Sequence, residues 1–321
     1  MSRLPPLFAL VLAAGCPGDP APTDPDASTA ADASPADAPP TRCDPSAPFG
    51  AVEPVVGLNL PGADDLGAQL TPDELTVFFT SDRANAPGRD YDLYVATRAS
   101  VDEPFGAPVA LDALRTDGFH EVSPTISADG LTIYFIRSPQ PTTRAGDVWV
   151  AVRTSPAEPF GPPSRVDAVS TEGTESSPYL TATGLYLARD REPGDPVDLD
   201  LVYAPRGPSG ELGEAVPLDG VNAVGADDAR PVLSADPLRI YWASARADGN
   251  YDIWTAARPS IDAPFADDAP VAELNSVGLD APNWLSPDGC TLYLTSQRAG
   301  DRSDIYVVRR PPPGGSVVGH R

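Results

Sequence analysis

Apolar and polar residues alternate along most of the chain in short runs, which is the pattern of half-buried β-strands. The most regular run is a triplet of aromatic and aliphatic residues, at residues 77–79, 133–135, 185–187, 240–242 and 292–294. A second run opens each time with an aspartate, at Asp92, Asp147, Asp200, Asp252 and Asp304. No stretch between these runs has the spacing of an amphipathic helix. The pattern therefore predicts an all-β protein and argues against an α/β fold.

These runs belong to a repeat that is marked by a short motif before each triplet. The motif is Leu or Ile, then Ser or Thr, any residue, and usually Asp, with its last position at Asp73, Asp129, Thr183, Asp236 and Asp288. Each copy holds four strand-like segments, and the fourth starts near a Pro-Phe pair in most copies. Repeats of four strands that cannot each bury both faces are typical of propeller blades. We therefore predict a five-bladed β-propeller with four antiparallel strands per blade.

The two ends of the repeat predict how the ring closes. The fifth copy stops after its third strand, at residues 307–309, while a Pro-Phe segment at residues 48–59 precedes the first copy. We expect this N-terminal segment to complete the last blade, which removes an open sheet edge that would invite aggregation.

The remaining segments predict an exported protein. Residues 1–15 have a basic start, a short apolar run and small residues, as in a signal peptide, and the run is too short to span a bilayer. Residues 16–45 are rich in Pro, Ala and Asp, which predicts a disordered tether. The propeller then takes residues 46–310, and residues 311–321 form a disordered tail.

The end of the apolar run, Leu12-Ala13-Ala14-Gly15-Cys16, resembles a bacterial lipobox. The resemblance implies cleavage before Cys16 and lipidation of this cysteine. Since Pro17 follows and no Asp stands there, it also implies an outer-membrane lipoprotein that faces the periplasm or the cell surface. The alternative is an ordinary secreted protein with a free Cys16.

Charge and composition exclude several classes of protein. The chain has 321 residues, 46 acidic and 22 basic, and a net charge of −24, so it lacks the basic face that nucleic-acid binding requires. Forty prolines argue against a helical protein. A hydrophobic fraction of 41% is enough for a folded core.

The full repeat pattern carries a family resemblance. Each copy follows one order of motifs, most completely in the second and fifth copies. The order is an acidic residue, Pro, Ser-x-Asp-Gly, an aromatic residue, Ser-x-Arg, and finally Asp-Ile-Tyr or Asp-Ile-Trp. This resembles the WD-like propeller repeat of TolB-like periplasmic proteins and envelope lipoproteins. The third copy departs from it, with Thr183 in place of the aspartate. TolB-like proteins commonly have six blades and this chain has five copies, so we do not transfer the TolB role.

A carboxylate lies at or near the entry of each innermost strand. These residues are Asp65, Glu121, Glu175, Asp228 and Asp280. In a propeller such positions ring the mouth of the central channel, so we expect an acidic ring that needs a counter-charge. One candidate is Ca²⁺ or a cationic ligand, because carboxylate oxygens suit calcium. The other candidate is arginine. Equivalent arginines follow the second strand at Arg83, Arg191, Arg246 and Arg298, and the second copy has Pro139 there with Arg137 close by.

Four other residues are candidates for a role beyond packing. Trp284 lies on an inner strand and His120 neighbours Glu121, so either could contact a ligand, with core packing and a solvated surface histidine as the alternatives. A lone histidine in the domain excludes a multi-histidine metal site and weakens a serine-triad hypothesis. Cys43 and Cys290 both belong to the predicted fifth blade. We expect a disulfide there, with two unpaired cysteines as the alternative.

From these observations we predict a non-catalytic binding or scaffold module at the cell envelope, monomeric, with an unidentified protein or small-molecule partner. The reason is that the candidate carboxylates recur once per blade and no singular catalytic constellation is visible. The first alternative is a glycoside-acting enzyme that uses Glu121 and Glu175, since some glycosidase families also have five-bladed propellers. The second is a structural envelope protein stabilised by calcium.

Overall fold

The computed structural model describes residues 42–83, 90–142, 145–191, 198–247 and 249–314. The predicted signal peptide, Cys16 and most of the predicted tether and tail lie outside these described residues. The last tether residues, 42–45, lie against the fifth blade, where the Arg42 guanidinium pairs with Asp288 at 2.6 Å. Within the described part of the chain, no helix is long and apolar enough to cross a membrane.

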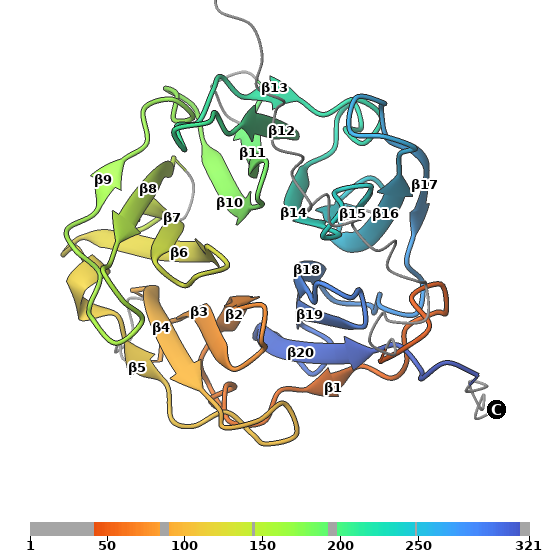
Figure 1. Ribbon diagram of the computed structural model, residues 1–321, viewed down its shortest axis with the longest axis horizontal. Helices are drawn as coiled ribbons and strands as arrows, with labels where there is room; N and C mark the ends of the chain where they lie inside the picture. Colours follow the sequence, from red (N-terminus) through yellow and green to blue (C-terminus); the bar gives the residue numbers. More distant parts are fainter. Residues whose placement is uncertain (1–41, 84–89, 143–144, 192–197, 248, 315–321) are drawn as a thin grey trace, which may run out of the picture. The chain divides into compact units, whose positions relative to one another are not determined.

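Five four-stranded antiparallel sheets surround a central axis (Figure 1). The inner strands are β2 (Asp65–Leu70), β6 (Phe119–Ile126), β10 (Glu175–Leu180), β14 (Asp228–Leu233) and β18 (Asp280–Leu285). The second strands are β3 (Thr76–Ser81), β7 (Thr132–Pro139), β11 (Gly184–Asp190), β15 (Arg239–Ser244) and β19 (Thr291–Ser296). The third strands are β4 (Asp92–Thr97), β8 (Asp147–Val152), β12 (Leu199–Pro205), β16 (Asp252–Ala257) and β20 (Asp304–Arg309). The outer strands are β5 (Val109–Ala110), β9 (Ser164–Arg165), β13 (Val216–Pro217), β17 (Ala266–Pro270) and β1 (Glu53–Pro54).

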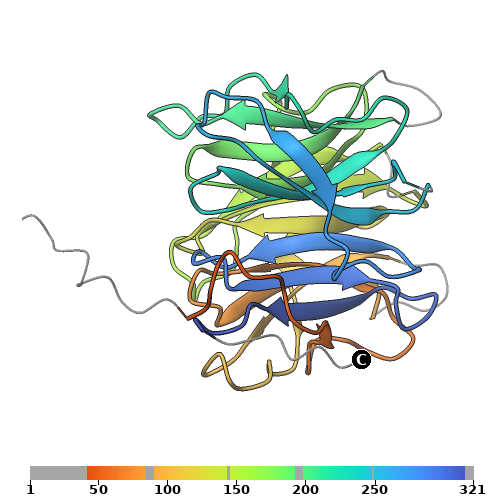
Figure 2. The same cartoon turned by 90° about the vertical axis from the view of Figure 1, so that its right-hand side faces the viewer.

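The predicted fold, a five-bladed β-propeller, is confirmed. The strands run from one face of the ring to the other (Figure 2). We call the face where the inner strands begin the entry face, and the face where they end, at the Ser-x-Asp turns, the turn face. A 3₁₀ helix, η2 (Asp112–Leu114), lies in the crossover from the first blade to the second.

The N-terminal segment closes the ring as its sequence predicts. Strand β1 pairs with β20, so Glu53 lies opposite Val307 and Pro54 opposite Tyr306. Cys43 and Cys290 form a disulfide with their Cα atoms 5.6 Å apart, across 247 positions of sequence. The last blade is therefore held by strand pairing and by a covalent bond between the two ends of the domain.

Every inner strand contains an irregularity in its pairing with the second strand. In four blades it includes a residue with positive φ two positions after the entry carboxylate, namely Gly67, Ser123, Ser177 and Arg230. The fifth blade has Pro282 there, whose ring prevents that conformation. These bulges place their residues around the axis, where they line a narrow central channel.

Hydrophobic burial joins each blade to its neighbour. One cluster, for example, combines Phe79 and Tyr94 of the first blade with Trp284, Tyr293 and Ile305 of the fifth. Since each buried aromatic side chain removes a large apolar area from water, the interfaces between blades hold the ring together.

The disulfide predicts a measurable stability difference. Substituting Cys43→Ser removes a cross-link that closes most of the chain, so the free energy of unfolding should fall by about 3–5 kcal/mol. Denaturant unfolding of the oxidised protein measures this change. Dithiothreitol should lower the stability of the parent protein to the same level and leave Cys43→Ser unchanged. Equal stability of the two oxidised proteins would contradict the prediction.

Candidate functional site

The five entry carboxylates are buried inside the blades. Each is at most 1% exposed. Each pairs with an arginine in or just after the second strand, with N–O distances of 2.6 Å for Arg83–Asp65, 2.8 Å for Arg137–Glu121, 3.4 Å for Arg189–Glu175, 2.9 Å for Arg246–Asp228 and 2.8 Å for Arg298–Asp280. Our expectation that these carboxylates face one another across the channel mouth is therefore wrong, because burial between strand and loop gives each of them its own partner.

Two geometries produce this pair. In the two blades with glutamate, the arginine lies directly opposite in the strand register, Arg137 to Glu121 and Arg189 to Glu175. In the blades with aspartate, a serine lies opposite, such as Ser81 opposite Asp65. The arginine then comes two residues later and folds back. The longer glutamate side chain reaches the arginine directly opposite on the second strand. The shorter aspartate side chain instead pairs with an arginine that lies two residues beyond the opposite serine and folds back toward it.

This difference corrects the partner that we predicted for the third blade. Arg191 has the same spacing as Arg83, but it pairs with Asp200 at 2.6 Å and Asp198 at 3.0 Å. Arg189, which our alignment of the copies passed over, holds Glu175 instead.

Carboxylate and arginine together also fix the crossover loop that leads into each blade. Backbone N–H groups of this loop donate to the carboxylates, as Leu60 does to Asp65 at 2.7 Å and Ala223 to Asp228 at 2.7 Å. The arginines donate to loop carbonyls, which belong to Leu58, Leu114, Val169, Val221 and Leu274. Among the described residues, no group of three or more His, Cys, Asp or Glu side chains could hold a metal ion. Arginine thus supplies the counter-charge for which we had considered calcium.

The two glutamates that we considered as a catalytic pair differ from the aspartates in their titration. Burial raises the pKa of Glu121 to about 7, against the opposing hydrogen bond from Arg137. Burial also raises the pKa of Glu175, against hydrogen bonds from Thr171. A carboxyl with a raised pKa suits a general acid. Glu121, however, borders only a void of about 10 Å³ between the first two blades, so it is not presented to a substrate.

His120 is also structural. It is 2% exposed, and its Nδ1 accepts a hydrogen bond at 3.1 Å from the Tyr91 N–H of the preceding blade. The equivalent Asp64 accepts in the same way from the Ser303 N–H at 2.9 Å. His120 is therefore neither a solvated surface histidine nor a ligand contact, because its position links neighbouring blades.

A second set of arginines joins the turn to the outer segment in four blades at the turn face. Arg98, Arg153, Arg258 and Arg310 each donate from Nε to a turn carbonyl, at 2.7–3.0 Å. Each guanidinium also lies over a phenylalanine ring of the outer segment, 3.9–4.5 Å from its centre. The third blade lacks this phenylalanine. Its equivalent residue, Arg206, is consequently exposed and lines the cavity at the axis.

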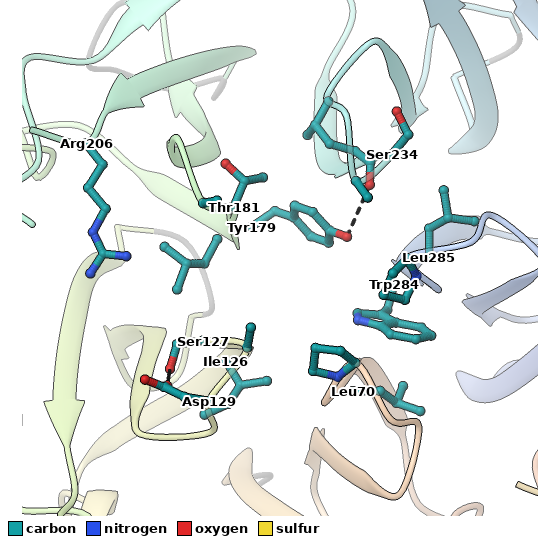
Figure 3. A pocket seen from close by; sticks show the side chains of 17 residues that line it. Leu70, Ile126, Ser127, Asp129, Tyr179, Thr181, Arg206, Ser234, Trp284 and Leu285 are labelled. Atoms are coloured by element: carbon teal, nitrogen blue, oxygen red, sulfur yellow. Dashed lines mark hydrogen bonds between the residues drawn. The ribbon is translucent and has the colours of Figure 1, made fainter. Parts of the chain in front are cut away.

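That cavity is lined by residues from all five blades. It lies where the inner strands end, has a volume of about 420 Å³, and is walled by residues such as Leu70, Ile126 and Leu285. The rings of Tyr179 and Trp284 lie on its wall (Figure 3). We call it the axial cavity. Its polar groups include the hydroxyls of Ser127, Thr181 and Ser234.

Two charged side chains belong to the described lining of the axial cavity, Asp129 and Arg206. Asp129 accepts hydrogen bonds from Ser127 Oγ at 2.5 Å and from the Leu131 N–H at 3.0 Å. The Ser127 hydrogen bond lowers the pKa of Asp129, with Arg206 as a further, smaller influence. This carboxylate therefore stays ionised near neutral pH.

Of the candidate site residues that we named in the sequence, Trp284 alone lines the axial cavity, and it also packs against Tyr293 with ring centres 6.0 Å apart. Asp129, which we had treated only as a repeat-motif position, lines it as well. We missed Tyr179 and Arg206 as cavity residues. The signal for Arg206 is present in the sequence: four copies combine a third-strand arginine with a Pro-Phe pair, and the third copy keeps only the arginine.

Comparison with known proteins shows the fold and shows no family. No family model matches the sequence, and no curated protein matches it. A family 117 glycoside hydrolase from Zobellia galactanivorans is similar in structure, with a TM-score of 0.57 and 14% identity over 86% of this chain and 96% of that one. A GH43_1 enzyme from Xanthomonas citri also gives 0.57 and 14%, over 85% and 97%. TolB from Acinetobacter baumannii gives 0.49 and 16%, and this chain spans about half of it, 55%.

These similarities contradict our prediction of a non-catalytic module that is not an enzyme. That prediction rested on carboxylates that recur once per blade, whereas the glycoside hydrolases named here are matched over nearly their whole length. At 14% identity the likeness itself establishes the fold alone.

The raised pKa values of the buried glutamates predict a pH dependence of stability. The folded protein binds a proton on Glu121 up to about pH 7, while the unfolded chain releases it near 4.5. Stability should therefore fall as the pH rises from 5 to 7, with a slope of up to about 1.4 kcal/mol per pH unit for this group. Urea unfolding across that range measures the slope.

The substitution Glu121→Gln should flatten this slope, whatever it does to the stability at a single pH. Glu175→Gln should act in the same direction, because burial raises the pKa of Glu175 as well. An unchanged slope in the double variant would contradict the prediction.

Proposed function

We propose that the protein is a glycoside-acting enzyme whose sugar-binding site is the axial cavity. The observation that carries the proposal is the composition of the cavity wall. Two aromatic rings, three hydroxyls and one ionised carboxylate surround about 420 Å³ at a point where all five blades meet. Small-molecule sites are concave and mostly apolar, with a few converging polar groups, and this cavity has that character.

The roles follow from the chemistry of the wall. A pyranose ring has apolar C–H faces that pack on aromatic rings, which Tyr179 and Trp284 supply, and equatorial hydroxyls that hydrogen-bond to Ser127, Thr181 or Ser234. Glycoside cleavage passes through a transition state with positive charge on the sugar ring. Asp129 is the carboxylate among the described lining residues, and its lowered pKa keeps it negative to stabilise that charge.

This assignment differs from the pair that we considered first. Glu121 and Glu175 are buried against arginines, so our proposal gives them a structural role. Asp129 acts in charge stabilisation. The leaving-group oxygen takes its proton from solvent, and a water molecule adds to the anomeric carbon and returns a proton to solvent.

We also propose that this domain works at the bacterial envelope, tethered through a lipid on Cys16 at the outer membrane, with the repeat as a WD-like propeller repeat. The lipobox-like residues 12–16 support the anchor, and the acidic net charge of −24 would keep the domain away from anionic membrane surfaces.

The enzyme proposal predicts release of reducing ends from a glycan. In a panel of polysaccharides and aryl glycosides, at least one substrate should be cleaved. Trp284→Phe should lower kcat/KM about 10-fold, because a smaller ring covers less of the sugar, and Asp129→Asn about 100-fold, because it removes the stabilising charge.

The chain offers a matched control for Asp129. Asp236 accepts the same two hydrogen bonds in the fourth blade, from Ser234 Oγ at 2.5 Å and the Leu238 N–H at 3.1 Å, but it does not line the axial cavity. Asp236→Asn should therefore keep activity within about twofold. Equal losses in both variants, or no cleavage of any substrate in the panel, would overturn the proposal.

The anchor predicts a covalent modification. The full chain, expressed in a bacterium that processes lipoproteins, should incorporate labelled palmitate and partition into a detergent phase. Cys16→Ala should abolish both, because the thiol is the acceptor. Incorporation that persists in Cys16→Ala would contradict the anchor.

A further inference from the structure

The described lining of the central channel contains one charged side chain, which has no part in the blade pairs or in the proposed sugar site. All five inner strands line the channel, through Gly67, Gln69, Ser123, Pro124, Ser177, Pro178, Arg230, Pro231, Pro282 and Asn283. Arg230 is the charged residue of this set. It occupies the bulge of β14 with a φ of 54°, in the same conformation as Ser123 and Ser177 in their blades. The fold therefore turns this position toward the axis, and one blade places a guanidinium there.

Arg230 differs from the other partly or fully buried arginines. The arginines that pair with the entry carboxylates each have a carboxylate oxygen within 3.4 Å. Those of the turn face donate to carbonyls and lie over aromatic rings. Among the residues that the structure describes, Arg230 makes no ion pair and no hydrogen bond. The residue is partly buried, and this burial lowers the pKa of its guanidinium. Arginine nevertheless remains charged, so this charge lacks a protein partner.

The neighbours of Arg230 offer polar groups without negative charge. Gln69 and Asn283 carry amides, and Ser123 and Ser177 carry hydroxyls. The Gln69 amide is already used, because it donates to the Asn283 carbonyl. The free volume is about 20 Å³, which is room for a group the size of a water molecule or the tip of a larger ligand.

The channel and the axial cavity occupy successive layers of the same strands. Gln69, Pro178 and Asn283 line the channel, and the next residues, Leu70, Tyr179 and Trp284, line the cavity. Arg206, which is exposed, places a guanidinium on the wall of the axial cavity. At the Arg230 position the other blades have Gly, Ser or Pro, so the propeller does not require an arginine there. Arg206 is the repeated turn-face arginine in the one blade that lacks the phenylalanine partner.

We propose that Arg230 is the anchor of an oxyanion-binding site in the central channel. The ligand group is a carboxylate or a sulfate. One of its oxygens enters the free volume and accepts N–H donors from the guanidinium, and the group supplies the charge that the channel lacks. Two sources have this chemistry: a free inorganic anion, or an acidic substituent of a sugar. Because the site rests on Arg230 and the channel, it stands independently of glycoside cleavage in the axial cavity.

Thermal unfolding of the full chain with sodium sulfate, compared with sodium chloride at equal ionic strength, tests the site. Sulfate should raise the Tm of the parent protein along a saturable curve, as expected for a ligand that binds the native state. Arg230→Gln should weaken the apparent affinity at least tenfold. The control Arg239→Gln removes an exposed arginine of β15 outside the channel and should behave like the parent protein.

A second measurement covers the stability of the variant itself. Without an oxyanion, Arg230→Gln should melt at or above the Tm of the parent protein, because it removes an uncompensated charge. Should Arg230→Gln fail to fold, Arg230→Lys replaces it, with weaker sulfate binding expected because the fork is lost. If the rise in Tm with sulfate does not saturate and is equal in all variants, it reflects the general stabilising effect of sulfate on folded proteins and overturns the proposal.

Calorimetric titration with glucuronate and with glucose distinguishes the sources. Glucuronate binding that exceeds sulfate binding and is lost in Arg230→Gln, with no glucose binding, assigns an acidic sugar. Sulfate binding without glucuronate binding assigns a free anion. Neither result depends on hydrolysis, so an inactive enzyme with an intact anion site would refute the proposed function alone.

Discussion

The structure depends on a buried arginine–carboxylate pair that recurs in every blade. Each pair joins the beginning of an inner strand to the second strand and to the crossover loop, while the backbone of the acidic residue reaches the preceding blade, as Asp65 N–H does to the Ser303 carbonyl at 2.7 Å. Removing one partner of such a pair would leave a buried charge and cost about 3–5 kcal/mol. The pairs therefore set the spacing between neighbouring blades as well as the geometry within each blade.

Because architecture is repeated five times, the departures from the repeat mark the places where specific chemistry becomes possible. Arg206 is released to the axial cavity because its blade lacks the phenylalanine on which the other turn-face arginines lie. Arg230 stands at a bulge where other blades have Gly, Ser or Pro. Trp284 places an indole where other inner strands have smaller residues or Tyr179. These three residues lie on or near one axis, Arg206 and Trp284 at the axial cavity and Arg230 in the channel next to it.

The repeated acids illustrate the opposite case. A carboxylate present once per blade was our strongest sequence candidate for a ligand site, and the structure gives all five an arginine. Even the two glutamates, with their raised pKa values, are isolated from solvent by the same pairing. The carboxylate that recurs in every blade thus serves the fold. The raised pKa values of the two glutamates did not by themselves identify a catalytic site.

The sequence by itself determined the fold. The period of the Ser-x-Asp motif, the alternation within its strands and the displaced Pro-Phe segment at 48–59 were sufficient for the blade count and for closure of the ring, because both depend on local pattern and on chain order. Side-chain direction was decided only by the tertiary structure. A bulge in each inner strand changes which positions face the axis, so spacing could not show that Arg230 reaches the channel. The partner of each entry carboxylate depends on side-chain length and cross-strand register, so spacing could not show that Arg189 rather than Arg191 holds Glu175.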